Sequence, residues 1–530
     1  MRYLTKIVGM LLFISITYAN AQIVAPPGQK AVSLLEAIQS TLLNHPVLRS
    51  QEAQVEISRG LREQASGLFD RSIQGGLLQN RDTTPLTTQQ KGEYLLAGHT
   101  VSDQTTNITT YEIGTSQLFR NGISIKPGFQ VSRYTDNLFS GSGINSSDMA
   151  LVVTVPLLRG RGRKAVAAQE TAAKIDVDAT ALDLDYLISQ LMASTATSYW
   201  SVVAAKRNLA IAYEAEERGR QYLDNVQALV AGDHVPRNDL NEVAANLAQR
   251  SSNRIAVEQQ LIAAQEQLAF NMGLDADRIV KEVPTPADDF PNGEAQQLPS
   301  DSPAAIEYYI TEALRRRADY LASGRRTAEE GVLLAAAQNR LLPQINLNFG
   351  GGFAGMQQGR RIDNFLASSA AGVQGPNATV GVSYVFPGSN QAARGALRQS
   401  DALSKQAQYR LNDLERSIGA SVITATHGVR NAILRLEKTR QSVSSFTAAL
   451  QGEREKYKGG IGSIVDILTV EDRLTTALSD EVQAKLGYAL ALTQFRFVTG
   501  TLAQPNAGAQ NIQADTLITL PFLRAPQERQ

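Results

Sequence analysis

Apolar side chains recur at helical spacing over several long stretches of the chain, and shorter stretches alternate strictly between apolar and polar residues. Helical spacing predicts amphipathic helices, whereas alternation predicts strands with one apolar face, so the chain reads as α+β. Helices are expected at residues 33–66, 164–229, 239–272, 303–340, 391–457 and 465–498. The two longest would each extend nearly 100 Å at about 1.5 Å per residue, which no compact core encloses. We therefore expect a rod or the wall of a tube.

The order of the predicted elements occurs twice, which indicates two internal structural repeats. A helix, strands, a long helix and a shorter helix fill residues 22–283, and the same order fills residues 304–499. Residues 284–303 are rich in proline and read as a connector, and residues 500–530 form a C-terminal tail. In each copy a glycine ends the long helix and an aspartate follows seven positions later, Asp239 after Gly232 and Asp466 after Gly459.

The first 21 residues have the order of a secretory signal peptide. Arg2 and Lys6 precede an apolar run at residues 7–16, and Ala19-Asn20-Ala21 forms a small-residue cleavage site. The run is shorter than the roughly 20 apolar residues that span a bilayer, and every later apolar stretch is interrupted by polar residues. We expect an exported chain, cleaved after Ala21, without a transmembrane helix.

The alternating segments lie between residues 73 and 157 and between residues 344 and 386. Ile345, Leu347 and Phe349, for example, alternate with polar side chains, and we count six strand candidates, including a hairpin at residues 111–134. A soluble β-sandwich would show the same alternation. Strand lengths of roughly 9 to 11 residues, long polar loops at residues 81–107 and 136–148, and export favour a membrane barrel. Because so few strands cannot enclose a lumen, several chains would have to close it together.

Composition argues against nucleic-acid binding, metal chemistry and catalysis. The 51 Lys and Arg residues balance the 51 Asp and Glu residues, so no net field attracts a polyanion. The absence of cysteine excludes disulfides and thiolate sites. The histidines are scattered at His45, His99, His234 and His427. Acidic pairs such as Asp183 with Asp185 and Glu471 with Asp472 lie on predicted helices and are interpreted as solvated. We expect no enzyme, no cofactor and no bound metal.

Short motifs, in their order along both copies, resemble those of the TolC-type outer-membrane efflux family, also called outer membrane factors. They are Asn44-His45-Pro46-Val47-Leu48, Pro156-Leu157-Leu158-Arg159-Gly160, Tyr199-Trp200, Arg317-Ala318-Asp319-Tyr320-Leu321, Leu341-Leu342-Pro343-Gln344 and the turn from Tyr457 to Leu468. The turn is the most informative of them.

The resemblance implies a homotrimeric outer-membrane β-barrel continued by a long periplasmic α-helical barrel. Each chain of the family gives four strands to a twelve-stranded barrel, so the extra hairpin at residues 111–134 either enlarges the barrel or extends beyond it. The implied function is the exit duct of a tripartite efflux pump or a type I secretion system. The implied partners are a periplasmic adaptor (membrane fusion) protein, an inner-membrane transporter and outer-membrane lipid.

The resemblance also assigns the two helix turns to the inner tip of the duct. Asp466, Asp239, Thr469 and Tyr457 are the candidate constriction, and the candidate adaptor-docking turns contain Gly232, Asp233, Gly459, Gly460 and Ser463. Two residues depart from the family's pattern in this turn. Thr469 stands where the family has its second acidic residue, and Gly462 stands where the family has a basic residue, which argues against a double ring of acidic side chains. The aspartates could instead cap the following helices.

A different class of function remains open on the pattern alone. An exported helical stalk or adhesin without a conducting lumen would also have a signal peptide and long helices. It would not require short alternating strands at the same place in each copy, which favours the duct.

Overall fold

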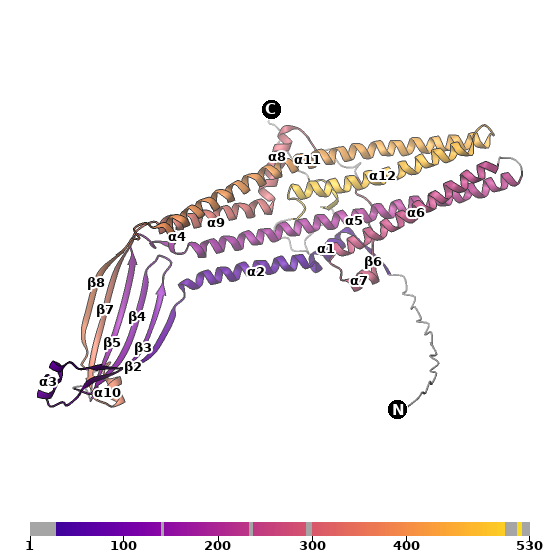
Figure 1. Cartoon of the computed structure of the whole chain (residues 1–530). Helices are drawn as coiled ribbons and strands as arrows, with labels where there is room; N and C mark the ends of the chain where they lie inside the picture. Colours follow the sequence, from indigo (N-terminus) through magenta and orange to yellow (C-terminus); the bar gives the residue numbers. More distant parts are fainter. Residues whose placement is uncertain are drawn as a thin grey trace, which may run out of the picture.

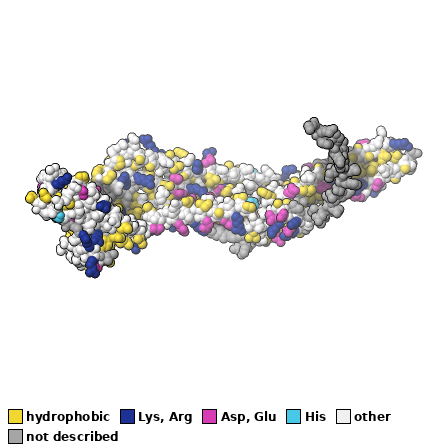
Figure 2. Space-filling view, turned by 60° about the horizontal axis from the view of Figure 1, so that its bottom comes forward, with side chains coloured by type: hydrophobic (Ala, Val, Ile, Leu, Met, Phe, Trp, Pro, Cys, Tyr) yellow, Lys and Arg dark blue, Asp and Glu magenta, His cyan; other side chains and the backbone are white. Residues whose placement is uncertain are grey.

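The computed structural model describes residues 28–138, 142–232, 237–292, 299–370, 372–503 and 517–521. The expected signal peptide lies outside these residues. The chain forms a long rod of helices with a β-sheet at one end. The turns of the two long helical hairpins lie at the other end (Figure 1). Charged side chains of both signs alternate along the face of the rod in Figure 2, without a broad patch of one sign.

The helical rod consists of eight main helices. They are α1 (Leu34–Asn44), α2 (Pro46–Ser66), α5 (Ala168–Ala231), α6 (Arg237–Asn271), α8 (Pro303–Arg316), α9 (Ala318–Arg340), α11 (Gln391–Lys458) and α12 (Ile464–Val498). Shorter elements are η1 (Gly67–Phe69), α3 (Thr88–Leu96), α4 (Arg163–Val166), α7 (Ala276–Lys281) and α10 (Ile362–Ala367). Within the described residues, no helix is long and apolar enough to cross a membrane.

Two helices that the pattern predicted as single are each broken in two. The break between α1 and α2 falls at His45, whose Nδ1 accepts a hydrogen bond from the Val47 amide, and Pro46 starts the new helix. The break between α8 and α9 falls at Arg317, which has an extended backbone and pairs with Asp319. After α1 and α2 the chain passes through four strands of the sheet to α5 and α6, and after α8 and α9 it passes through two strands to α11 and α12.

Six antiparallel strands form the sheet, in the order β2-β3-β4-β5-β7-β8. Their bounds are β2 (Ser72–Pro85), β3 (Asp103–Leu118), β4 (Ser124–Asp136), β5 (Ile144–Pro156), β7 (Gln344–Gln358) and β8 (Gln374–Val385). The predicted count of six is confirmed, but the strands have 12 to 16 residues and are longer than predicted. Residues 81–107, expected as a loop, contain the ends of β2 and β3 and the helix α3.

The expected connector also begins inside regular structure. Residues 284–286 belong to β6 (Glu282–Pro286), which pairs in parallel with β1 (Gly28–Val32) beside the rod. Pro303, the last expected connector residue, is the first residue of α8. A strand of this kind tolerates proline because its other edge is not part of a wider sheet.

Strand register places the alternating apolar residues of all six strands on one face of the sheet. Leu347 lies opposite Val382 on β8 and opposite Val155 on β5. The apolar face also contains Leu77, Ile113, Phe129, Val131, Met149, Leu151, Val153, Ile345, Phe349, Phe353, Val380 and Tyr384. The opposite face presents residues such as Lys126, Gln130, Asn346, Asn348 and Ser383. We call these the apolar face and the polar face of the sheet.

The short helix α10 covers the end of the apolar face that is remote from the rod. The ring of Phe365 packs edge-on against Tyr111, with centroids 5.2 Å apart. Ser147 donates a hydrogen bond of 2.7 Å to the Ser368 carbonyl, and a Cβ at Gly355 would lie only 2.0 Å from the same carbonyl oxygen. The loop after β7 therefore folds back onto the sheet.

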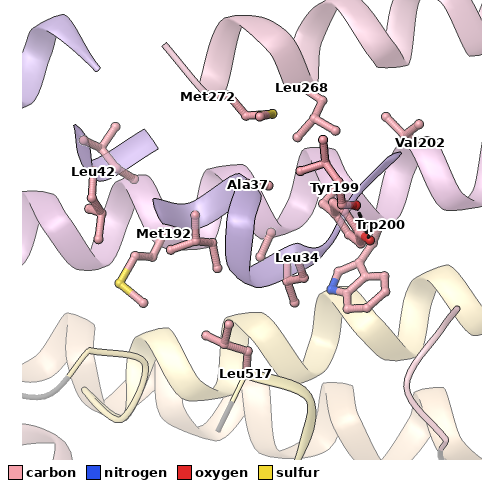
Figure 3. Close-up of a cluster of buried hydrophobic side chains, with 14 of the residues drawn as sticks. Leu34, Ala37, Leu42, Met192, Tyr199, Trp200, Val202, Leu268, Met272 and Leu517 are labelled. Carbon is pink, nitrogen blue, oxygen red and sulfur yellow. Dashed lines mark hydrogen bonds between the residues drawn. The ribbon is translucent and has the colours of Figure 1, made fainter. Parts of the chain in front are cut away.

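The largest apolar cluster lies in the middle of the rod, where α1, α5 and α6 meet and where the tail returns (Figure 3). Tyr199 and Trp200 of α5 are fully buried there. The Tyr199 hydroxyl donates to Asp288 Oδ2 at 3.0 Å or to the Val32 carbonyl at 3.1 Å, and it accepts from the Asp288 amide. Leu517 of the C-terminal tail is also buried in this cluster. The C-terminal tail thus contributes to the core.

The apolar face predicts a contrast between two neighbouring positions on β7. If lipid contacts this face, Leu347→Arg should cost about 2–4 kcal/mol in the membrane, whereas Asn346→Arg on the polar face should be tolerated. Urea titration of both variants refolded into lipid vesicles measures the difference. Equal insertion and equal stability of the two variants would contradict the lipid-facing assignment.

Candidate functional site

The two long hairpins end close together, at the end of the rod opposite the sheet (Figure 1). Gly459 terminates α11, and Gly460 has a φ of +77°, which favours glycine over residues with a side chain. Gly232 terminates α5 with its amide bonded to the Ala228 carbonyl. Asp233, a predicted docking residue, and His234 lie outside the described residues.

Asp466 takes part in a capping box at the start of α12. The Ser463 amide donates to Asp466 Oδ2 at 3.3 Å, and the Ser463 hydroxyl accepts from the Val465 amide at 3.1 Å. The Asp466 side chain is nevertheless exposed, as is that of Thr469 one turn later. The capping role considered for Asp466 is present in the structure, and its exposed position leaves the carboxylate accessible to solvent.

Asp239 and Asp466 occupy similar places, each in the first turn of the helix that follows its hairpin turn. One apolar cluster contains Val243 of α6 together with Ile464 and Ile467 of α12, and Leu240 packs against it. Further along, Asn246 of α6 donates a hydrogen bond of 3.2 Å to Asp472 of α12. The starts of α6 and α12 are therefore joined at the same end of the rod.

Tyr457 is half-buried and packs against this same cluster. Its ring is therefore part of the contact between α11 and its neighbours. The structure brings Tyr457, Asp466 and Thr469 together in the α11–α12 hairpin, whereas Asp239 belongs to the α5–α6 hairpin.

A buried carboxylate further from the turns joins all four helices of the two hairpins. Glu471 of α12 is completely buried. Its Oε2 accepts a hydrogen bond of 2.9 Å from Arg250 of α6, and its Oε1 accepts one of 3.3 Å from Arg454 of α11. Arg218 Nε of α5 lies 2.8 Å from the same Oε1 as an ion pair, although its N–H direction does not meet hydrogen-bond geometry. We call these four residues the Glu471 cluster.

Arg250 is held by further contacts. It donates to the Ala215 carbonyl of α5 and to Asn246 of its own helix, and it pairs with Asp472 at 2.9 Å. With only 7% of its side chain exposed, its charge depends on these protein partners. The interpretation of Glu471 and Asp472 as a solvated pair is therefore wrong, because Glu471 points into the helix bundle and Asp472 binds a buried arginine.

A second carboxylate cluster lies between α5 and α6. Glu216 accepts a hydrogen bond from Ser251 at 2.9 Å and pairs with Arg220 at 2.8 Å and Arg254 at 2.6 Å. The Ser251 hydroxyl and the two guanidinium groups hold the pKa of Glu216 below its ordinary value. Glu216 therefore stays ionised and keeps the first hairpin closed in a way that does not involve the second.

The titratable side chains of the described residues do not gather into a metal site. No cluster of three or more His, Asp or Glu there has the arrangement of a metal site. His45 acts as a helix cap, and burial lowers its pKa. Asp183 pairs with Arg326, and burial raises the pKa of Asp185. The polar groups of the rod serve to join helices.

The chain is similar to outer-membrane channel proteins in sequence and in structure. A family model described as outer membrane efflux protein matches residues 309–501. The outer membrane protein TolC of Vibrio cholerae is 25% identical over 388 residues, which are 69% of this chain and 82% of that protein.

Solved structures share the fold over most of their length. The outer-membrane channel OprN has a TM-score of 0.65 and 18% identity, covering 88% of this chain and 90% of its own. The outer-membrane channel CmeC of Campylobacter jejuni has a TM-score of 0.62 and 14% identity, covering 92% and 90%. The MtrE channel of Neisseria gonorrhoeae has a TM-score of 0.60 and 16% identity, covering 88% and 89%.

The Glu471 cluster predicts a large effect of a small change. Glu471→Gln keeps the shape but removes the charge that Arg250 needs, and breaking a buried pair in this way costs about 3–5 kcal/mol. Thermal unfolding followed by circular dichroism should show a clearly lower Tm. Glu437→Gln on α11, which breaks an exposed pair with Lys438, is the control and should leave Tm unchanged. A Tm for Glu471→Gln equal to that of the control would show that the cluster does not hold the hairpins.

Proposed function

The chain belongs to the TolC-type outer-membrane efflux family, and we propose that it forms the exit duct of a tripartite efflux pump or a type I secretion system. It is an outer-membrane protein with a helical periplasmic extension. In this role the protein passively conducts substrates from the periplasmic assembly to the exterior, and it catalyses no reaction.

The observation that carries the proposal is the continuity of the six-stranded sheet with helices of 64 and 68 residues. Between Ile345 and Gly355 the apolar face extends about 33 Å along the strand, at about 3.3 Å per residue. Tilted by about 40°, it matches the roughly 25 Å apolar band of outer-membrane barrels. The polar face is then available to line a lumen, and the helices continue the wall into the periplasm.

One chain provides only part of such a wall, so the duct is proposed to be a homotrimer. Its sheet contacts outer-membrane lipid. At the other end, a periplasmic adaptor protein binds the helix turns, and an inner-membrane transporter supplies the substrate. The turns suit docking because they are the exposed ends of the rod farthest from the sheet, and Ile461 at the second turn is 83% exposed. The docking residues are Gly232, Asp233, Gly459, Gly460 and Ser463.

Docking at the turns can be tested by adding bulk there. Gly460→Trp should abolish export because it changes the shape of an exposed turn, while the trimer remains stable on semi-native gels. Gly395→Trp is the matched control, since Gly395 is an exposed α11 glycine at the sheet end with open space around its Cα. Export is measured as drug accumulation or secreted polypeptide in cells. Normal export by Gly460→Trp, or photo-crosslinks from this turn to outer-membrane proteins only, would contradict docking.

The constriction is proposed at the same end, formed by Asp466 and Thr469 with Tyr457 packed behind them and by Asp239 of the other hairpin. Threefold repetition of an exposed carboxylate makes a ring of like charges, which attracts cations where the passage is narrow. Asp239 would add a second set of three carboxylates at the same end of the trimer.

Asparagine separates the two roles of Asp466, because its amide oxygen can still accept the Ser463 amide but carries no charge. In planar bilayers, Asp466→Asn should reduce cation preference and weaken block by multivalent cations, with the Tm of the trimer almost unchanged. Asp413→Asn, which removes an exposed α11 carboxylate far from the turn, is the control. Unaltered selectivity of Asp466→Asn would leave this residue only a capping role.

A further inference from the structure

The six-stranded sheet is open at both sides. β2 pairs only with β3, and β8 pairs only with β7, among the residues that the structure describes. Each outer strand therefore presents a row of backbone N–H and C=O groups, along 14 residues of β2 and 12 residues of β8. In hydrocarbon such groups have no water to bind, so every edge must be paired.

The apolar face reaches both edges of the sheet in the half nearer the rod. On β8 it comprises Val380, Val382 and Tyr384, and on β2 it comprises Ile73 and Leu77, which are 73% and 66% exposed, before Gln79 and Arg81 follow on the same face. A soluble sheet would blunt its edges with charges or bulges, whereas the half of each edge nearer the rod carries no charge on this face. Both edges therefore belong inside the membrane band, where a second strand must cover them.

The two edges match each other in direction. The strands alternate, so that β2 leads away from the rod and β8 leads back to it (Figure 1). When copies of the chain stand side by side with their rods parallel, β8 of one copy lies antiparallel to β2 of the next. Because each chain has an even number of alternating strands, its first and last strands run in opposite directions, so the pairing between neighbouring copies is antiparallel like the rest of the sheet.

The additional hairpin, β3 with β4, is an integral part of the sheet. β3 pairs with β2 and β4 pairs with β5 over their lengths, so the hairpin separates the two strands that would otherwise be neighbours. Phe129 lies opposite both Ile113 and Met149 and continues the apolar face across it. The sequence left two possibilities, that the hairpin enlarges the barrel or that it extends beyond it. Its pairing within the sheet favours the first.

We propose that β8 of each copy pairs with β2 of the next copy and that three copies close a barrel of eighteen strands. The inference rests on the proposed trimer and differs from the twelve strands implied by the family resemblance. Six strands are fewer than the eight of the smallest membrane barrels, so one copy cannot close a lumen alone. At a spacing of about 4.8 Å and a tilt of about 40°, the backbone diameter rises from about 24 Å for twelve strands to about 36 Å for eighteen.

Disulfide trapping can test the seam, because the natural chain contains no cysteine. Ser383→Cys is placed on the polar face of β8 and combined in turn with Gln74→Cys, Leu78→Cys and Asn80→Cys on the polar face of β2. Mild oxidation of membranes should give covalent dimers and trimers with one of these partners and little with the others, because a strand seam has one register. Gln130→Cys on β4, paired with the same Ser383→Cys, is the control and should remain monomeric on non-reducing gels.

Links within single chains only, equal linking by the β4 control, or no link with any β2 partner would overturn the proposed seam. Cryo-electron microscopy of the purified assembly viewed along its axis counts the strands independently. Eighteen strands are expected. A conducting trimer with twelve barrel strands and the β3–β4 hairpin outside the wall would overturn this inference and leave the proposed function intact, whereas a soluble monomer without channel activity would overturn both.

Discussion

The unpaired backbone N–H and C=O groups along the two edges of the sheet need hydrogen-bond partners that the single chain does not supply. Large apolar side chains of this face, such as Leu77, Val380 and Val382, stay exposed within the chain, and among the described residues the outer sides of β2 and β8 have no strand partner. A membrane can cover the face, but only another strand can satisfy the edges. The rod is thin as well: many of the buried residues of α5 are alanines, and the larger apolar side chains gather in separate clusters along its length. In the proposed trimer, copies of the chain supply the strand partners that a single chain lacks.

Within one chain, the two hairpins depend on contacts of different kinds. In the middle of the rod, aromatic packing around Tyr199 and Trp200 joins α5 to α1, α6 and the tail. Nearer the turns, the apolar cluster is smaller, and the Glu471 cluster supplies a directional connection among four helices. A buried charge cluster requires all of its partners in place, because an unpaired buried charge is costly. The position of one hairpin relative to the other therefore depends on the contacts of the Glu471 carboxylate with its three arginines.

The sequence predicted the regular elements better than their contacts. Helix α11 was expected at residues 391–457 and spans Gln391–Lys458, because a long periodic pattern without proline has few alternatives. The strands were underestimated because Thr-rich and Asn-rich segments such as residues 104–110 read as loop, although threonine suits an exposed strand. Nothing local marks Glu471 as buried, since its three arginines lie on other helices. The break at Arg317 has no proline to announce it, unlike the break before Pro46.

The two longest helices also set the distance between the sheet and the helix turns. Neither α5 nor α11 contains a proline, and at about 1.5 Å per residue α11 alone is roughly 100 Å long. Shortening one of these helices by a turn would move its residue of the Glu471 cluster, and its residues of the adjoining apolar cluster, away from their partners. The length of the rod can therefore change only if all four hairpin helices change together. The rod therefore acts as a spacer of set length. The depth to which the molecule reaches below its sheet is built into the chain, and any molecule that meets its turns has to bridge the remaining gap from its own side.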